Sequence, residues 1–204
     1  MKKHIFKNIE KGVALGLVCA AVLSFARFEA RLDELRSGVL RLHILANSDS
    51  DADQELKLKV RDRILEVTKE SLAQAEGLDE AIDIADGEMD KIIAAASEVV
   101  SSEGFTYDVR AAIEENFFEN RDYGDFTLPA GVYNSLTVRI GDAKGHNWWC
   151  VVFPGICLPA AEKGRLEDTV SYASAKTARE APKYKVRFKA AEIYERIRHK
   201  FSKK

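Results

Sequence analysis

The apolar positions of the chain first indicate a strand followed by an amphipathic helix. Residues 39–46 are apolar almost throughout, which is typical of a buried strand. A polar hinge follows at 47–53, and the next segment has two apolar stripes on nearly opposite sides of a helix, at Leu56, Val60, Ile64 and Val67 and at Leu58, Leu65 and Leu72. We therefore expect this helix to lie between a sheet and another element.

The middle of the chain is expected to supply a second long helix and several strands. Apolar residues recur at helical spacing from Leu78 to Ser102. Apolar and polar positions then alternate over 105–113 and again over 132–140. A turn leads to a strand over 147–153, which we predict to pair back on 132–140 as a hairpin. Because 147–153 is apolar on both faces, either another element covers the second face or a patch is exposed for a partner.

The C-terminal region is less regular. Residues 159–183 are small, charged and aperiodic, and we predict a flexible loop. A short strand at Val186 and Phe188, and then a helix with a basic tail, are expected over 184–204. The predicted fold class is α+β: a single core domain over 27–158, in which two long helices pack on a mostly antiparallel sheet, with an additional helix at each end of the chain.

The first 26 residues differ from the rest. Four lysines precede an uncharged run over 12–26, which as a helix spans roughly 22 Å, less than the ~30 Å hydrocarbon core of a bilayer. The basic start, the apolar run and the small residues up to a predicted cleavage after Ala26 are typical of a secretory signal peptide. An uncleaved membrane anchor is the alternative, and both interpretations predict export.

Export changes what the remaining cysteines indicate. Beyond Cys19 the chain has Cys150 and Cys157, separated by a stretch that contains the turn pair Pro154-Gly155. A disulfide between them is predicted for an oxidising compartment, with two structural thiols or a reactive thiol as the alternatives. The four histidines lack the spacing of metal ligands, so neither a metal site nor a cofactor is predicted.

Composition is that of a folded soluble domain, with 46% apolar and 31% charged residues, but the charge is unevenly placed. After residue 26 the chain has 27 basic and 32 acidic residues, whereas 183–204 alone has nine basic and two acidic ones. A basic tail on an acidic body suits an anionic membrane or wall surface, and a solvated helix end explains it equally well. No nucleic-acid-binding module is indicated.

The hinge at 47–53 is crowded with side chains that are able to bind a metal ion or to do chemistry. A calcium loop needs Gly at its sixth position and Glu at its twelfth, where this chain has Gln54 and Val60. Ser48 and Ser50 lack the neighbouring glycines of a hydrolase elbow. We therefore interpret the hinge first as a helix cap, in which a serine caps the helix and the acidic residues meet its dipole.

The helix after the hinge has an unfavourable charge pattern. Lys57 lies one turn before Arg61, and Lys59 one turn before Arg63, so that like charges repel. This repulsion suggests a basic face that a partner uses.

Two long segments resemble a known family. The sequence RLHILANSDSDADQELKLKVRDRILE (41–66) is similar to the signature of the stage II sporulation protein R family of endospore-forming Firmicutes. The sequence LPAGVYNSLTVRIGDAKGHNWWCVVFPGICL (128–158) resembles its second block, with tandem tryptophans and paired cysteines. With the N-terminal segment and the YKVRFKAAEIYE tail (184–195), the resemblance covers most of the chain, 159–183 excepted.

The resemblance implies a signalling protein without catalytic residues. Members are exported from the forespore into the intermembrane space, where they activate a membrane-embedded aspartic protease, stage II sporulation protein GA. That protease then processes the sigma-E precursor in the mother cell. The candidate partner-binding residues are the hinge group and the tandem tryptophans, namely His43, Asn47, Ser48, Asp49, Trp148 and Trp149.

Two other classes of function stay open at this point. One is a cell-wall hydrolase that uses His43 with Asp49, although a core histidine explains His43 as well. The other is a wall- or membrane-binding module that uses the basic C-terminus.

Overall fold

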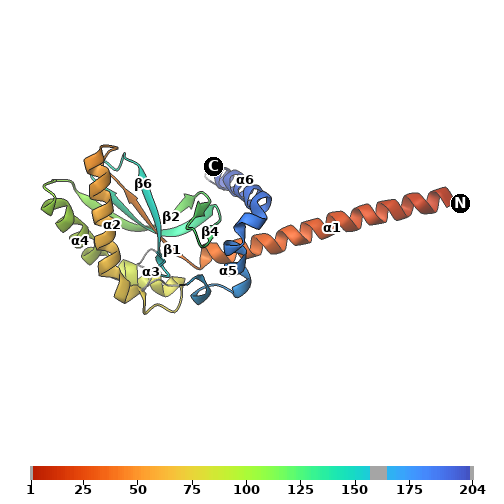
Figure 1. Ribbon diagram of the computed structural model, residues 1–204, viewed down its shortest axis with the longest axis horizontal. Helices are drawn as coiled ribbons and strands as arrows, with labels where there is room; N and C mark the ends of the chain where they lie inside the picture. Colours follow the sequence, from red (N-terminus) through yellow and green to blue (C-terminus); the bar gives the residue numbers. More distant parts are fainter. Residues whose placement is uncertain (1, 157–164, 203–204) are drawn as a thin grey trace.

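A mixed four-stranded sheet, in the order β2-β5-β1-β6, forms the centre of the domain. The computed structural model describes residues 2–156 and 165–202 (Figure 1). Strand β1 (Leu40–Leu45) is parallel to β5 (Gly131–Ile140) and antiparallel to β6 (Asn147–Phe153), and β2 (Val109–Phe118) pairs antiparallel with β5. The predicted hairpin between 132–140 and 147–153 is wrong, because β1 lies between these two strands. Strand β6 is consequently an edge strand.

Helices α2 (Asp51–Leu72), α3 (Leu78–Gly87) and α4 (Met89–Ser102) cover one face of the sheet (Figure 1). Buried side chains of these helices and of alternate strand positions make the first core, which includes Leu42, Ile44, Leu56, Val60, Ile64, Ile92, Leu136 and Val138. The prediction of one helix over 78–102 is wrong, because the backbone leaves the helical conformation at Glu88 (φ −97°, ψ 11°), directly after Gly87. Glycine is a weak helix former, which favours a break at this point.

The second face is covered by the C-terminal part of α1 (Lys2–Ser37), by α5 (Tyr172–Arg179) and by α6 (Lys185–Ser202). Two short strands, β3 (Arg121–Asp122) and β4 (Thr127–Leu128), lie on the same side. This second core includes Phe28, Leu32, Leu35, Phe118, Leu128, Tyr133, Val151, Ala175, Ala178 and Phe188. The apolar second face of 147–153 is therefore explained by a covering layer, and the single α+β domain is confirmed.

The C-terminal third differs from the sequence prediction. Residues 159–164 of the predicted loop lie outside the described residues, but 166–168, α5 and 181–184 are helical. Ser174 of α5 donates a hydrogen bond to the Glu34 carboxylate of α1 (2.5 Å), so this segment is docked on α1. The predicted strand at Val186 and Phe188 is instead the first turn of α6, in which Phe188 is buried and Val186 is exposed.

Helix α1 has two parts with different surroundings. Every side chain from Ile9 to Arg27 is exposed, whereas Phe28, Leu32 and Leu35 are buried in the second core. The segment Ile9–Ser37 is apolar and long enough to cross a membrane, judged by length and composition. Its N-terminal part projects far from the domain in Figure 1, as a signal or an anchor segment would. The helix is continuous through Ala26, and cleavage there stays a prediction.

Candidate partner-binding surface at the edge of the sheet

The hinge after β1 is held by a buried carboxylate. Asp53, which is only 3% exposed, accepts hydrogen bonds from the amide of Asn47 (3.0 Å) and the hydroxyl of Ser48 (2.5 Å). The Ser50 hydroxyl caps α2 by accepting from the backbone N–H of Asp53 (3.2 Å). Burial alone would raise the pKa of the Asp53 carboxyl, but the hydrogen bonds from Ser48 and Asn47 outweigh it and lower the pKa. The predicted serine cap is confirmed.

A second loop, between β5 and β6, is clamped to this hinge. The Asn47 side-chain oxygen accepts from the backbone N–H of Asp142 (3.0 Å), and Asp49 accepts from the N–H of His146 (2.6 Å). Gly145 passes so close that a Cβ there would lie 2.1 Å from the Ser48 carbonyl oxygen, so the approach requires glycine. The polar groups of Asn47 and Ser48 therefore make hydrogen bonds within the fold, and of the candidate residues His43, Asn47, Ser48 and Asp49 only Asp49 is exposed.

The basic residues of α2 do not form one common face. Lys57 is buried (4% exposed) and donates to the His146 carbonyl (2.9 Å), and burial lowers the pKa of its ammonium group. Lys59 pairs with Glu103 and Glu55, while Arg63 pairs with Glu66 and Glu98. The guanidinium of Arg61 alone among the four lies over an aromatic ring, 4.6 Å from the centroid of the Trp148 ring. The suggestion of a shared basic face is replaced by one half-buried arginine, Arg61, which lies over Trp148 and also forms an ion pair with Asp62 (2.7 Å).

The tandem tryptophans lie on the edge strand β6 and point to opposite faces of the sheet. Trp148 packs against the first core and Trp149 against the second, and both are half-buried. Each tryptophan thus contributes to one of the two cores, and neither is fully exposed. Both indole N–H groups are buried without a hydrogen-bond acceptor in the described parts of the chain. Unsatisfied buried donors of this kind are rare in native proteins and require an explanation.

His43 lies directly opposite Trp149 on the neighbouring strand. Its ring is 6.1 Å from Trp149 and 5.9 Å from Phe118, centroid to centroid, and burial lowers the pKa of its imidazole. The ring nitrogens are buried, and a hydrogen-bond interaction with the Asn147 side chain opposes the effect of burial on the pKa without cancelling it. Asp49 pairs with His146 instead, so the structure does not bring His43 and Asp49 together as a hydrolase would need.

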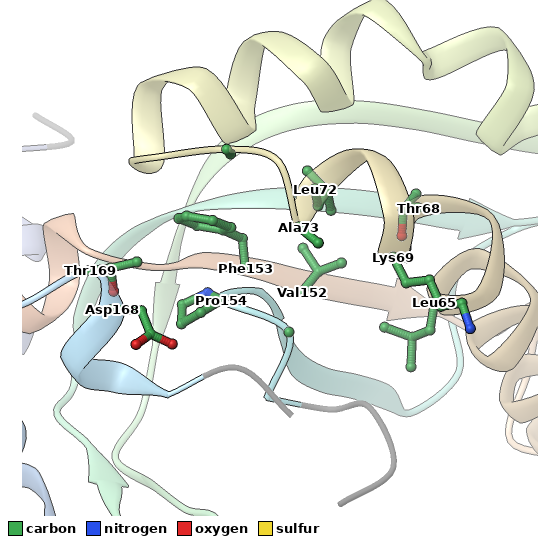
Figure 2. A pocket seen from close by; sticks show the side chains of 12 residues that line it. Leu65, Thr68, Lys69, Leu72, Ala73, Val152, Phe153, Pro154, Asp168 and Thr169 are labelled. Atoms are coloured by element: carbon green, nitrogen blue, oxygen red, sulfur yellow. The ribbon is translucent and has the colours of Figure 1, made fainter. Parts of the chain in front are cut away.

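A pocket of about 440 Å³ wraps around the edge strand at the tryptophans. Its wall combines α2, β6 and the β3 region, and consists of Arg61, Asp62, Leu65, Arg121, Asp122, Tyr123, Trp148, Trp149, Cys150 and Ile156. Leu65 also lines a second, mainly apolar hollow of about 190 Å³ between α2 and the end of β6, where Figure 2 shows Leu65, Leu72, Val152 and Phe153 around the opening. Both hollows lie on the α2–β6 side, and we call the larger one, at the tryptophans, the edge groove.

The predicted site residues thus fall into two groups at one end of the β1–β6 pair. The clamp contains Asn47, Ser48 and Asp49, and the edge groove contains Trp148 and Trp149, with the half-buried His43 ring next to Trp149. Cys150 is buried beside the groove, but Cys157 lies outside the described residues, so the disulfide stays a prediction. Sequence reasoning missed Tyr123 and Arg121, because only the tertiary fold brings the β3 region to the tryptophans.

Comparison with known proteins gives the family. The sequence profile of the stage II sporulation protein R family matches residues 36–163. The chain belongs to this family. The stage II sporulation protein R of Bacillus subtilis (strain 168) is 35% identical over 119 residues, which are 58% of this chain and 53% of that protein. The match thus spans about half the length of this relative. No solved structure matches the chain.

The matched region coincides with the elements that build the candidate surface. Residues 36–163 include β1, the hinge, α2 and all of β6, and they end before α5 and α6. The clamp and the edge groove are therefore part of the family's common region, whereas the exposed part of α1 and the C-terminal helices lie outside it. Membership supports a role in sporulation.

Proposed function

We propose that this protein is an exported sporulation signal that activates a membrane-embedded aspartic protease, stage II sporulation protein GA. The protease would then process the sigma-E precursor in the mother cell, and the protein itself would act as a ligand and not as an enzyme. The observation that carries the proposal is the family match over 36–163. The apolar exposed part of α1 supports export from the forespore into the intermembrane space, with the domain on the outer side of the membrane.

The edge groove is the surface that fits a protein partner best. Aromatic and arginine side chains dominate binding energy at protein interfaces, and here Trp148, Trp149, Tyr123 and Arg61 line one pocket. An edge strand also offers a backbone to which an extended segment of another chain is able to add.

Activation requires that the ligand distinguish two states of the protease. Shifting a receptor from about 1% to about 99% active needs roughly 10⁴-fold tighter binding to the active state, which is about 5.5 kcal/mol. Two or three buried anchor side chains, each worth about 2 kcal/mol or more at an interface, are sufficient for this difference. Anchors that the protease contacts only in its active state would thus account for switching without any catalytic group on the ligand.

The test is reconstitution of precursor processing in a host that does not sporulate. The protease and the sigma-E precursor are co-expressed with or without this chain, and precursor cleavage is followed on an immunoblot. We expect cleavage only when the exported chain is present. Cleavage that is indifferent to the chain would refute the proposed function.

Arg61→Ala in the same assay tests the surface. We expect it to lower processing about tenfold or more, as loss of one anchor would. Folding should change by about 1 kcal/mol, because the variant loses one cation–π contact with Trp148 and one ion pair with the exposed Asp62.

Arg63→Ala is the matched control, because Arg63 is on the same helix and also forms ion pairs, with Glu66 and Glu98, but does not line the edge groove. Surface ion pairs contribute little, so neither stability nor processing should change. Equal processing by both variants would place the contact elsewhere.

A further inference from the structure

Helix α6 exposes an apolar stripe that the domain does not cover. Val186 is 84% exposed and Phe201 is 71% exposed, and Ile193, Tyr194 and Ile197 are each about half exposed. At 100° per residue these five side chains lie within roughly 100° of one another on the helix surface. The opposite side of the helix holds it on the second core through Phe188 and Ala191. The stripe therefore faces away from the protein.

Basic residues border the stripe on both sides. Arg187 and Arg198 follow one edge, and the other edge carries Lys185, Lys189, Arg196 and Lys200. Three of these six form ion pairs with Glu192 or Glu195, which are buried on the side of α6 that faces the domain. Six cations against two anions still leave α6 with an excess of positive charge. An apolar face between two rows of Lys and Arg is the pattern of a helix that lies in the interface of an anionic bilayer.

The position of α6 relative to α1 agrees with this pattern. The Arg187 guanidinium donates to the Ser24 hydroxyl (3.3 Å) and lies 5.7 Å from the centroid of the Phe28 ring. Phe28 also contacts Phe188, with ring centroids 5.7 Å apart. Phe28 is buried, and it directly follows the exposed side chains from Ile9 to Arg27 of α1. Helix α6 thus meets α1 where α1 leaves the domain (Figure 1).

We propose that α6 docks on the surface of an anionic phospholipid bilayer, with the Val186–Phe201 stripe among the lipid headgroups and the flanking Lys and Arg side chains on the lipid phosphates. If α1 crosses a bilayer through its exposed apolar part, the Ser24–Phe28 region is at the point of exit, and α6 reaches the same surface. The domain would then be held at the membrane by two elements. This inference stands apart from the proposed function, since α5 and α6 lie outside the family match.

The experiment measures the depth of α6 in a membrane, because α1 alone would bring the full chain to vesicles. A fluorescent non-natural amino acid replaces Ile197 in the full-length chain, which is reconstituted into vesicles of phosphatidylcholine, with or without phosphatidylglycerol. Lipids brominated along their acyl chains serve as the quencher. The control carries the same label at Asp90, an exposed position on α4 on the opposite face of the sheet.

We expect brominated lipid to quench position 197 several-fold more than position 90 in vesicles that contain phosphatidylglycerol. Quenching at 197 should weaken in phosphatidylcholine alone and at high salt, since screening removes the attraction of the basic borders. Replacing both Ile193 and Phe201 by Ser should cut the quenching about tenfold through loss of buried apolar area. Equal quenching at 197 and 90 would overturn the proposal.

A second result would also overturn it. Protection of position 197 that rises with protein concentration and ignores the brominated lipid would show that another copy of the chain covers the stripe. The same assay without the protease keeps this outcome separate from any failure of the proposed function.

Discussion

Asn47→Ala should destabilise the fold, because Asn47 is the residue that joins the two loops of the clamp. The substitution removes a hydrogen bond to the buried Asp53 carboxylate and another from the backbone N–H of Asp142. A hydrogen bond to a charged group contributes about 1.5–3 kcal/mol and a neutral one about 0.5–1.5 kcal/mol. We therefore expect a loss of about 2–4 kcal/mol in the free energy of unfolding.

The assay is urea unfolding of the detergent-solubilised chain, followed by the fluorescence of its two tryptophans, both of which pack against a core. The matched control is Asn134→Ala, since the half-buried Asn134 side chain makes no hydrogen bond with the described residues and should cost little. The lowered pKa of Asp53 gives a further check. Its stabilising contribution is present above the unfolded pKa of about 3.9 and is lost as the pH falls through the folded pKa. The difference between variant and parent should thus shrink below about pH 4.

A loss of less than about 0.5 kcal/mol for Asn47→Ala, equal to that of Asn134→Ala, would refute this reasoning. It would mean that the hinge is not held by its polar side chains, and would return Asn47 to the list of residues that are free to bind a partner. If Asn47→Ala instead proves both unstable and inactive, its inactivity says nothing about contact with a protease.

Two further predictions concern basic side chains of β1. His43→Gln should remove part of the acid sensitivity of the fold, because burial, and then neighbouring positive charge, lower the folded pKa of His43. The parent protein should keep its full stability above about pH 6.5 and lose stability as the pH falls from there toward the folded pKa. If the urea midpoints of parent and variant, each relative to its own value at pH 7.5, are identical down to about pH 5.5, the prediction is contradicted. Arg41 is 0% exposed, lies over the Phe118 ring (4.1 Å) and donates to the Tyr123 hydroxyl (2.7 Å), while its Nε and Nη1 have no partner among the described residues. Arg41→Met should thus change the free energy of unfolding by less than about 1.5 kcal/mol, whereas Arg41→Ala, which leaves a cavity, should lower it by about 2 kcal/mol or more. Thermal unfolding of the two variants measures the difference, and an equal loss of stability in both would contradict the prediction.

The strands and helix α2 were predictable because their hydrophobic patterns are local. Residues 39–46, 132–140 and 147–153 are strands close to the predicted bounds, and Ser50 caps α2 as its position before Asp51 and Asp53 suggests. The order of the strands was not predictable in the same way. A turn between 140 and 147 suggests a hairpin, but β1, from 90 residues earlier, lies between these strands, and no local pattern encodes that pairing.

The C-terminal helices were missed for a different reason. Helix α5 packs on α1 through the small residues Ala175 and Ala178, so it has no stripe of large apolar side chains for a periodicity search to find. The strand was predicted at Val186 and Phe188 from two apolar positions only. Residues two apart also point in different directions on a helix, where Phe188 is buried and Val186 is exposed.

Part of the candidate site was predictable from the sequence. The tandem tryptophans pointed to the edge groove, because a strand that is apolar on both sides needs two covering layers or a partner. A sequence does not show that Asn47 and Ser48 turn toward a buried Asp53, so their structural role was not predicted, and their contact with a partner stays a prediction. Arg61 was one of four similar cations, and only the fold sets it apart by placing it over Trp148.

Site-directed photo-crosslinking tests most directly whether the edge groove contacts the protease. A photo-reactive amino acid replaces Asp62, which lines the groove beside Trp148, or Asp83, which is exposed on α3. Each chain is exported from cells that also contain the membrane protease and the sigma-E precursor, and processing is confirmed before illumination. We predict a covalent adduct with the protease from position 62 and none from position 83. Normal processing with no adduct from position 62, or with equal adducts from both positions, would contradict the edge groove as the surface that delivers the signal.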